Sequence, residues 1–342
     1  MRLPEPRGVL SESLVGVLDG STSGILDTGP AEVAEPWLDD DLQLSLWMLY
    51  ELHYRGFDGV DPDLEWDPEL IRLRGGLETR FLDGVRAAVT VPEARSVAAG
   101  LTSLAGQDTG PSMSRYLQRT ATLEQFREFV VHRSIYHLKE ADPHSWGIPR
   151  LGGRPKAALV EIQSDEYGGG RLERMHAELF RTTMASLGLD TGYGAYLGSV
   201  SAPTLATNNL MSLFGLHRRW LGALLGHLAA YEMTSSIPNR RYGNALRRLG
   251  GDANATRFYD EHVTADAVHE QIAAHDLCGG YVEQNPAAAP DVLFGAAAGL
   301  FLDDVAASWI LARWESGRSA LEPHELVSPV AERLAPGLAT PA

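Results

Sequence analysis

The sequence predicts an all-α protein, and three observations support this fold class. Apolar residues recur every three or four positions along most of the chain, as they do in amphipathic helices. No stretch shows the alternation of apolar and polar residues that is typical of a half-buried strand. Proline and glycine clusters divide the helical pattern into separate segments. With 342 residues, of which 44% are hydrophobic, the chain can bury a sizeable core.

Residues 1–115 are expected to form an N-terminal helical accessory region. Residues 1–35 are rich in proline, glycine, serine and acidic residues, which suits a loosely structured lead-in. Residues 39–54 are apolar enough for a buried helix, and their first aspartates favour a helix N-terminus. Residues 69–89 predict another helix, and a break at 106–111 ends the region.

Residues 116–320 are expected to form the core, and residues 321–342 a C-terminal tail. Helical periodicity runs from Ser114 to Lys139, and a proline-rich connection follows it. A long helix is predicted from Lys156 to about Leu187, with Gly168–Gly170 in its middle. Three glycines cost a helix about 3 kcal/mol relative to alanine, which favours a local bulge there.

Three further helices complete the predicted core. The first, Leu205–Thr234, is expected to end before Pro238. The second, Phe258–Leu277, is expected to stop at Gly279–Gly280, since glycine is a common C-terminal signal. The last runs from Asp291 to about Ser316.

Net charge and hydropathy limit the classes of partner that the protein is expected to bind. The net charge of −16 and the scattered arginines would repel phosphate backbones, so we expect no nucleic-acid partner. The proline-rich start of the chain has no apolar signal segment, which predicts a cytoplasmic protein. The apolar segment Leu293–Ala312 contains Asp303–Asp304, a pair too costly for a bilayer centre, so we expect a core helix and no membrane partner. A homodimer is a candidate assembly.

Cysteine usage limits the chemistry. Cys278 is the single cysteine, so an internal disulfide and a thiolate-based zinc site are both excluded. Any metal is therefore expected to be held by nitrogen and oxygen donors.

A stripe of three candidate metal ligands lies on the predicted helix that contains His262. Asp266 lies roughly 40° around the helix from His262, and His269 lies about 20° away on the other side. Imidazole with carboxylate suits borderline transition metals. Three such groups on one helix leave coordination positions for other helices to fill.

A second candidate set lies on the predicted helix from Lys156. Glu166 and Glu173 are about 20° from alignment, and His176 lies about 60° from Glu173, so the three can face one side. Glu173 and His176 have the Glu-x-x-His spacing of helix-bundle di-iron carboxylate proteins. Taken alone, the same spacing also occurs in solvated pairs on surface helices.

Glu232 adds a third set. It lies at the end of an apolar run, where a carboxylate is costly to bury without a partner such as a metal. The three helices then offer three histidines and four carboxylates, enough for two metals with open positions for O2 or substrate.

These motifs resemble the haem-oxygenase-like di-iron oxidases, which are also called iron-containing redox enzymes. The resemblance covers about residues 120–315, and the order and spacing of its pieces agree with that family. The motifs that carry it are Glu161-Ile162-Gln163-Ser164-Asp165-Glu166-Tyr167-Gly168-Gly169-Gly170, Glu173-Arg174-Met175-His176, Tyr231-Glu232-Met233-Thr234-Ser235-Ser236 and His262-x-x-x-Asp266-x-x-His269.

The resemblance implies a seven-helix haem-oxygenase-type bundle in which three core helices bind two Fe(II)/Fe(III) ions. It implies iron ligation by Glu166 and His176 of the first core helix and by Glu232 of the second. The third would supply His262, Asp266 and His269. Glu173 matches an additional carboxylate of members that oxygenate amine nitrogen, which favours a ligand and catalytic role for it.

Four other positions allow two interpretations each. Glu140 is either an extra ligand or a residue of a cap or salt bridge, and His227 is either a site residue or a packed core histidine. Asp303–Asp304 either contributes one member to a pocket or forms a polar stripe. Arg240–Arg241 either holds a substrate carboxylate or lies in a solvated loop.

The expected function is that of a non-haem di-iron oxidase with O2 as cosubstrate and an external electron donor as a candidate partner. The resemblance favours a free amino acid or amine as the small-molecule substrate. Desaturation, cyclisation, N-oxygenation and C–C cleavage are the candidate outcomes, in specialised metabolism. A fatty-acid decarboxylase of the same family is the runner-up. Haem degradation, thiamin-salvage hydrolysis through Cys278 and a non-catalytic binding protein are the rival classes.

Overall fold

The computed structural model describes residues 1–22, 24, 34–107 and 112–321, apart from the side chains of residues 264–267. Every regular element in these ranges is a helix, and none is a strand, which confirms the all-α prediction. The residues predicted as a C-terminal tail lie outside the described chain from 322 onward. The α-helices are, in order, α1 Val9–Leu18, α2 Asp40–Glu51, α3 Pro68–Ala88, α4 Val97–Ala105, α5 Met113–Arg119, α6 Leu123–His137, α7 Asp142–Ser145, α8 Gly153–Glu166, α9 His176–Ser186, α10 Ala202–Leu216, α11 Leu221–Arg248, α12 Ala253–Gln271, α13 Gly280–Gln284 and α14 Ala289–Glu315.

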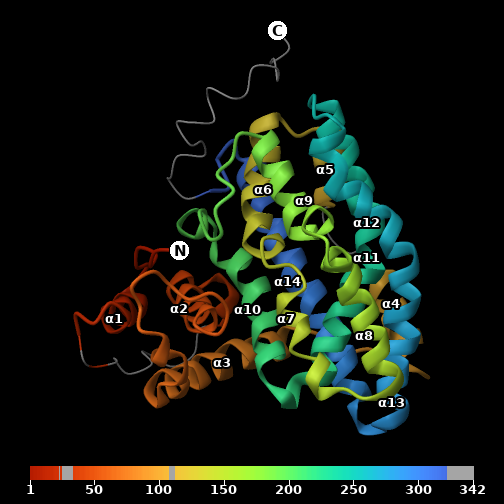
Figure 1. Ribbon diagram of the computed structural model, residues 1–342, viewed down its shortest axis with the longest axis horizontal. Coiled ribbons are helices and arrows are strands. Elements are labelled where there is room, and N and C mark those ends of the chain that lie inside the picture. The colour runs from red at the N-terminus through yellow and green to blue at the C-terminus, as the bar shows by residue number, and fades with distance from the viewer. Residues whose placement is uncertain (23, 25–33, 108–111, 322–342) are drawn as a thin grey trace.

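The N-terminal helices α1, α2 and α3 lie together beside a bundle of longer helices (Figure 1). The side chains of Asp39 and Asp67 accept hydrogen bonds from the first backbone N–H groups of α2 and α3, so both helices begin at an aspartate cap. Buried residues of these helices and of the bundle belong to one continuous hydrophobic core. The division at residue 115 therefore remains a prediction about sequence regions.

Helix α1 was not expected, because residues 1–35 were predicted to be loose. Leu14 and Leu18 are buried on it, and Asp41 of α2 accepts hydrogen bonds from the backbone N–H groups of Leu10 and Ser11. The helix is thus stabilised by contacts with α2 that a local reading of proline and glycine content does not detect.

Helices α11 and α14 pack closely along the centre of the bundle. A Cβ atom on Gly226 would overlap the carbonyl of Val292, and one on Gly295 would overlap the carbonyl of Ala223. Glycine at these two positions lets the backbones approach and brings the site-bearing part of α11 against the rest of the bundle.

The predicted long helix over residues 156–187 is wrong, because the chain turns sharply within it. Helix α8 ends at Glu166, and α9 begins at His176. Gly168, Gly169 and Gly170 all have positive φ angles, of 63°, 61° and 77°. This left-handed backbone breaks the helix completely, where a bulge was expected.

Two predicted helix ends are also wrong. Helix α11 continues through Pro238, which cannot supply the backbone N–H that the carbonyl of Thr234 would otherwise accept in the helix. Beyond α12 the chain continues as a π-helix, Ile272–Gly279, and then as α13. The helical path therefore does not end at Gly279–Gly280. A Cβ atom on Gly280 would lie 2.9 Å from Nε of Arg154, so a close contact explains this glycine.

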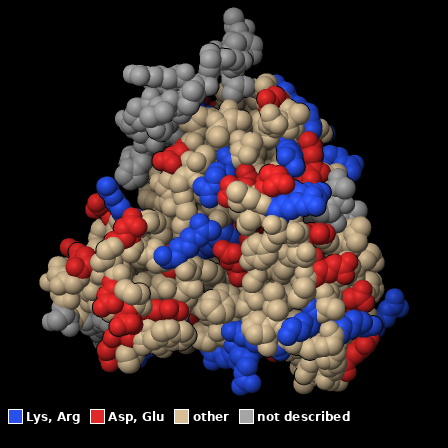
Figure 2. All heavy atoms as spheres, in the orientation of Figure 1, with Lys and Arg blue, Asp and Glu red and all other residues tan. Residues whose placement is uncertain are grey.

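One helix, Pro286–Glu315, is long and apolar enough to cross a membrane by length and composition, and more than half of its apolar stretch is buried inside the protein. The burial is that of a bundle helix, as expected for this segment. Acidic and basic side chains are mixed over the face in Figure 2, so neither sign forms a continuous field there.

Candidate metal centre

Two groups of buried nitrogen and oxygen donors lie side by side in the bundle. In the first, one ligand atom each of Glu140, Glu166, His176 and His262 lies within 4.8 Å of the others. In the second, the same holds for Glu166, Glu232 and His269. Glu166 belongs to both, so the two groups form one extended centre. We call them cluster 1 and cluster 2.

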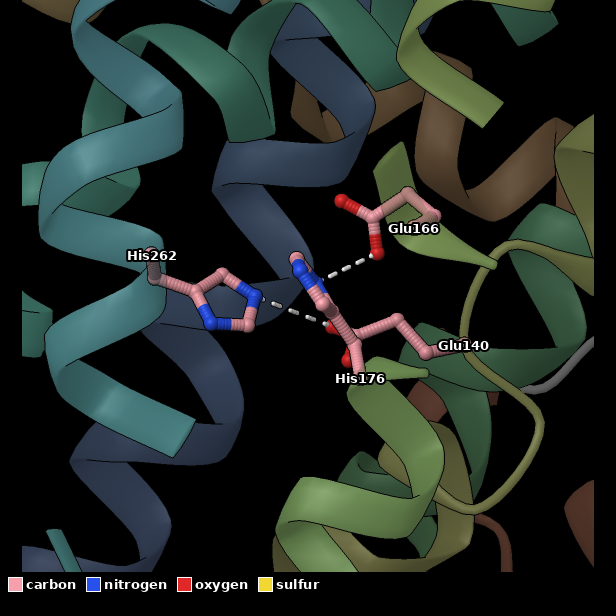
Figure 3. Close-up of side chains that lie close together, drawn as sticks. All are labelled: Glu140, Glu166, His176 and His262. Atoms are coloured by element: carbon pink, nitrogen blue, oxygen red, sulfur yellow. Dashed lines mark ion pairs between the residues drawn. The ribbon is translucent and has the colours of Figure 1, made fainter. Parts of the chain in front are cut away.

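Cluster 1 draws its donors from four separate parts of the chain (Figure 3). Nδ1 of His176 lies 2.9 Å from Oε2 of Glu166, and Nε2 of His262 lies 3.7 Å from Oε1 of Glu140. All four side chains are at most 8% exposed. Four converging donors in a dry environment are the composition of a nitrogen and oxygen metal site.

Cluster 2 joins α8, α11 and α12. Nδ1 of His269 lies 3.3 Å from Oε2 of Glu232. Asp266 lies on α12 between His262 and His269, but its side chain is outside the described residues. Its role as a ligand therefore remains a prediction.

Glu173 does not lie with the other predicted ligands. It is exposed and belongs to a short 3-10 turn, Leu172–Arg174, where it lines a separate surface hollow. The predicted alignment assumed one continuous helix from Glu166 to His176, and the glycine turn removes that continuity. The structure thus does not bring Glu173 into either donor group, and a catalytic role for it remains a prediction.

Glu140 supplies the additional carboxylate instead. It follows the end of α6, immediately before Ala141, whose φ of 71° is the only positive value among the described non-glycine residues. The amide of Gln163 donates a 2.7 Å hydrogen bond to the carbonyl of Ala141, which holds this turn against α8. Oε1 of Glu140 also lies 2.8 Å from Nδ1 of His137, one helical turn earlier. The extra-ligand interpretation of Glu140 fits this position.

Hydrogen bonds outside the clusters orient two of the imidazoles. Nδ1 of His262 lies 2.8 Å from the carbonyl oxygen of Phe258, so it carries the proton and leaves Nε2 to face cluster 1. Nε2 of His269 lies 3.0 Å from a carboxylate oxygen of Asp165, which leaves Nδ1 facing cluster 2. Such outer partners fix the tautomer and ring orientation of metal-binding histidines.

Several buried atoms at the centre have no hydrogen-bond partner within the protein. They are Oε2 of Glu140, Oε2 of Glu166, Nδ1 of His176 and Nδ1 of His269. Nδ1 of His176 is close to Glu166 but not aligned with it as a hydrogen bond. Buried polar atoms are almost always paired, so these unpaired atoms are suited to bind a metal ion. Imidazole nitrogen and carboxylate oxygen are ligands that iron accepts.

Protonation supports the same interpretation. Burial acts to lower the pKa of both imidazoles, but Glu166 raises the pKa of His176, and Glu232 with Asp165 raises the pKa of His269 to about 9. In the metal-free protein, protons on these imidazoles balance the buried carboxylates. A bound cation would take over that role and release the protons.

A cavity of about 140 Å³ opens beside the clusters. Glu140, Glu166, Glu232 and His262 line one part of it, and Arg133, Asp303 and Tyr259 line another. The remaining wall combines four aromatic residues, Phe129, Tyr136, Tyr231 and Tyr242, with smaller apolar and polar side chains.

Within this cavity Arg133 is the cation, and sequence reasoning missed it. Its Nη1 lies 2.9 Å from Oδ1 of Asp303, so Asp303 is the member of the Asp303–Asp304 pair that reaches the pocket. Arg240 is exposed and Arg241 donates to Ser114, and neither lines the cavity. The signal available in the sequence was an arginine placed within the apolar stretch Phe129–Ile135 of α6.

His227 and Cys278 both lie in the core. His227 is fully buried, and its Nδ1 lies 3.1 Å from Nε2 of His144, which itself lines the cavity. Cys278 is fully buried, its thiol donates to the carbonyl of Leu225, and burial raises the pKa of that thiol. A nucleophilic role for Cys278 has no support from this environment.

Comparison with known proteins agrees with the geometry. Residues 127–304, which include every donor of both clusters, match the family described as iron-containing redox enzymes. The chain belongs to this family. The match covers more than half of the chain, and family membership explains why the clusters consist of imidazoles and carboxylates.

A nitrosourea synthase from Streptomyces achromogenes subsp. streptozoticus is similar to this chain, with 28% identity over 224 residues. The alignment covers 62% of this chain and 46% of the relative. The chain therefore spans about half the length of that curated relative.

Proposed function

We propose that this protein is a non-haem di-iron oxidase that uses O2 to oxidise a small free amino acid or amine. The observation that supports this most directly is the shared carboxylate Glu166, which belongs to both donor clusters. A carboxylate between two nitrogen and oxygen donor sets is the arrangement of helix-bundle di-iron proteins. Iron bound there would supply the electrons that activate O2 and the site at which the substrate is oxidised.

The side chains of this protein prepare that chemistry. Phe258 and Asp165 hold His262 and His269 as the tautomers that aim a lone pair at the clusters. His137 and the turn at Ala141 fix Glu140. The aromatic residues of the cavity wall would limit the access of water to the reacting groups once substrate is bound.

The relative named nitrosourea synthase favours nitrogen oxidation among the candidate outcomes, because a nitrosourea contains a nitrogen–oxygen bond. Insertion of one oxygen atom uses one O2, two electrons and two protons and releases one water. An external reductant would supply the two electrons. A role in specialised metabolism is part of the same proposal.

Anaerobic titration with Fe(II) tests the proposal. We expect about two equivalents of bound iron, then O2 consumption and a transient visible absorption when air is admitted. Free amino acids, amines and fatty acids would then be screened for mass changes of about −2 or +16, the signs of desaturation and oxygen insertion.

Other results would reject it. Binding of one equivalent or less, or two equivalents without O2 consumption in the presence of reductant and the substrate panel, would remove the di-iron oxidase assignment. A Soret band with tight haem binding would favour haem degradation, and a fatty-acid product one carbon shorter would favour decarboxylation.

A further inference from the structure

We propose that the Arg133–Asp303 pair binds the carboxylate and ammonium groups of a free α-amino acid, whose side chain then extends to the iron centre. This inference rests on the proposed function and names the residues that select the substrate. It begins from a feature that the metal centre does not explain, namely an ion pair within the wall of the same cavity.

The pair is accessible from the cavity. The side chains of Arg133 and Asp303 are 28% and 37% exposed, whereas the cluster side chains are at most 8% exposed. Guanidinium has five N–H donors, and the ion pair with Asp303 uses Nη1. The fork of Arg133 can therefore hold Asp303 and a ligand carboxylate together.

The charges select a zwitterion. Arg133 and Asp303 together are neutral, so a molecule with adjacent positive and negative groups can pair with both and add no net charge. A fatty acid would bring its carboxylate beside Asp303 with no cation for that aspartate. A simple amine would bring a cation beside Arg133 with no anion for that arginine. Both leave a charge poorly compensated in a partly desolvated site.

A buried hydroxyl marks the same end of the cavity. Tyr259 is 2% exposed, lines the cavity, and its hydroxyl has no hydrogen-bond partner. Its ring packs 5.8 Å from that of Tyr242, which packs 4.7 Å from Phe129, the ring beneath the guanidinium of Arg133. An unpaired buried hydroxyl is costly unless a ligand completes it.

The spacing sets the length of the substrate. Arg133 and His137 lie one turn apart on α6, and Glu140 follows three residues after the end of that helix, so roughly 6–10 Å of chain separate the ion pair from the clusters. A long side chain such as that of lysine or arginine spans this interval. The substrate class is therefore a free α-amino acid with a long side chain.

Calorimetric titration of the Fe(II)-loaded protein under nitrogen tests the inference without turnover. The probes are L-lysine and L-arginine, their decarboxylated analogues cadaverine and agmatine, and ε-aminocaproate, which is lysine without its α-amino group. We expect at least one of the amino acids to bind about 10- to 100-fold more tightly than its analogues, the range of charge-assisted hydrogen bonds.

Variants assign the contacts. Arg133→Met should remove the preference for the amino acid over its decarboxylated analogue, and Arg133→Lys should keep part of that preference. Asp303→Asn should remove the preference for the amino acid over ε-aminocaproate. Tyr259→Phe should weaken binding several-fold while leaving the ligand-free protein as stable as before or more stable, because the lost hydroxyl has no partner there. Circular dichroism and iron content verify that each variant folds and loads.

The two proposals fail separately. If iron loads to about two equivalents and O2 is consumed, but the amino acids and their analogues bind equally or not at all, the pair is structural and the inference is overturned. Unchanged selectivity in Arg133→Met has the same meaning. If the amino acids bind selectively but iron stays near one equivalent, the inference stands and the di-iron assignment fails.

Discussion

Glu166 is the residue on which both donor clusters depend, since it belongs to each of them. Glu166→Gln removes the negative charge but keeps the size of the side chain. We expect iron binding to fall from about two equivalents to less than one, because both metals lose the shared carboxylate. Anaerobic titration with a colorimetric iron assay measures the stoichiometry.

Glu173→Gln is the matched control, because this exposed glutamate was predicted as a ligand but lies outside the clusters. It should keep about two equivalents. Loss of iron in Glu173→Gln, or full loading in Glu166→Gln, would contradict the assignment of ligands made from the structure.

The buried His132, which lies outside both clusters, should make the free energy of unfolding depend on pH. Its Nδ1 lies 2.7 Å from the hydroxyl of Thr204 and its Nε2 lies 3.0 Å from the carbonyl oxygen of Ala320, so the neutral ring accepts from one and donates to the other. Burial lowers its pKa from 6.5 to about 4. The unfolded chain binds the proton first as pH falls, so the stabilisation is present above about pH 6.5 and is lost toward pH 4.

The expected loss is at most about 3 kcal/mol in the free energy of unfolding. Urea unfolding at several pH values between 7.5 and 4 measures it. His132→Gln, which keeps a donor and an acceptor but does not titrate, should show a smaller loss over this range. An equal loss in the variant would assign the effect to other groups.

At the scale of elements, the turn between α8 and α9 determines where His176 points. Gly168 has positive φ, and a Cβ atom there would lie 2.5 Å from the backbone of Arg174. Gly168→Ala should therefore cost more than about 2 kcal/mol of stability and weaken iron binding by displacing His176. Thermal unfolding and iron affinity are the measurements.

Gly169→Ala provides the comparison, because its φ is also positive but its Cβ would meet nothing within 4 Å. It should cost about 1 kcal/mol and leave iron affinity unchanged. Equal effects of the two substitutions would show that backbone strain alone, and not the contact with the backbone of Arg174, governs the turn.

The turn between α8 and α9 also marks the point beyond which local helix geometry no longer predicts the positions of the site residues. His262 and His269 were predicted on one helix, and both lie on α12, because their spacing depends only on local helix geometry. Glu173 was misplaced because that geometry was carried across three glycines whose φ angles are positive. The sequence could not decide whether Glu140 is a ligand. Its position beside cluster 1 depends on the hydrogen bond from Gln163 to the carbonyl of Ala141, a tertiary contact that no local pattern reveals.

At the scale of the whole molecule, a buried ion pair connects the N-terminal helices to the candidate metal centre. Nζ of Lys139 lies 3.5 Å from Oε2 of Glu51 of α2, and both side chains are at most 2% exposed. Tyr193 donates a further 2.7 Å hydrogen bond to Glu51. Lys139 directly precedes Glu140, so this contact helps to hold the ligand-bearing turn.

Lys139→Met should destabilise the protein by about 3–5 kcal/mol, because Glu51 remains buried without its cation. The double variant Glu51→Leu/Lys139→Met should recover most of that loss, since both charges are gone. Chemical unfolding of the two variants measures the difference. If the double variant is no more stable than the single one, packing around Lys139 and not charge pairing is responsible.

If iron binds at both clusters as proposed, we expect the hydrogen bond between His269 and Asp165 to give the two ions different lifetimes. The donors of both clusters are at most 8% exposed, but Asp165, the outer partner of His269 in cluster 2, is 62% exposed, whereas the outer partner of His262 in cluster 1 is the backbone carbonyl of Phe258. A chelator added to the loaded protein should then remove iron in two phases, with the cluster 2 ion leaving first. Asp165→Asn should accelerate only the fast phase, and a protein isolated with a single equivalent should hold it in cluster 1.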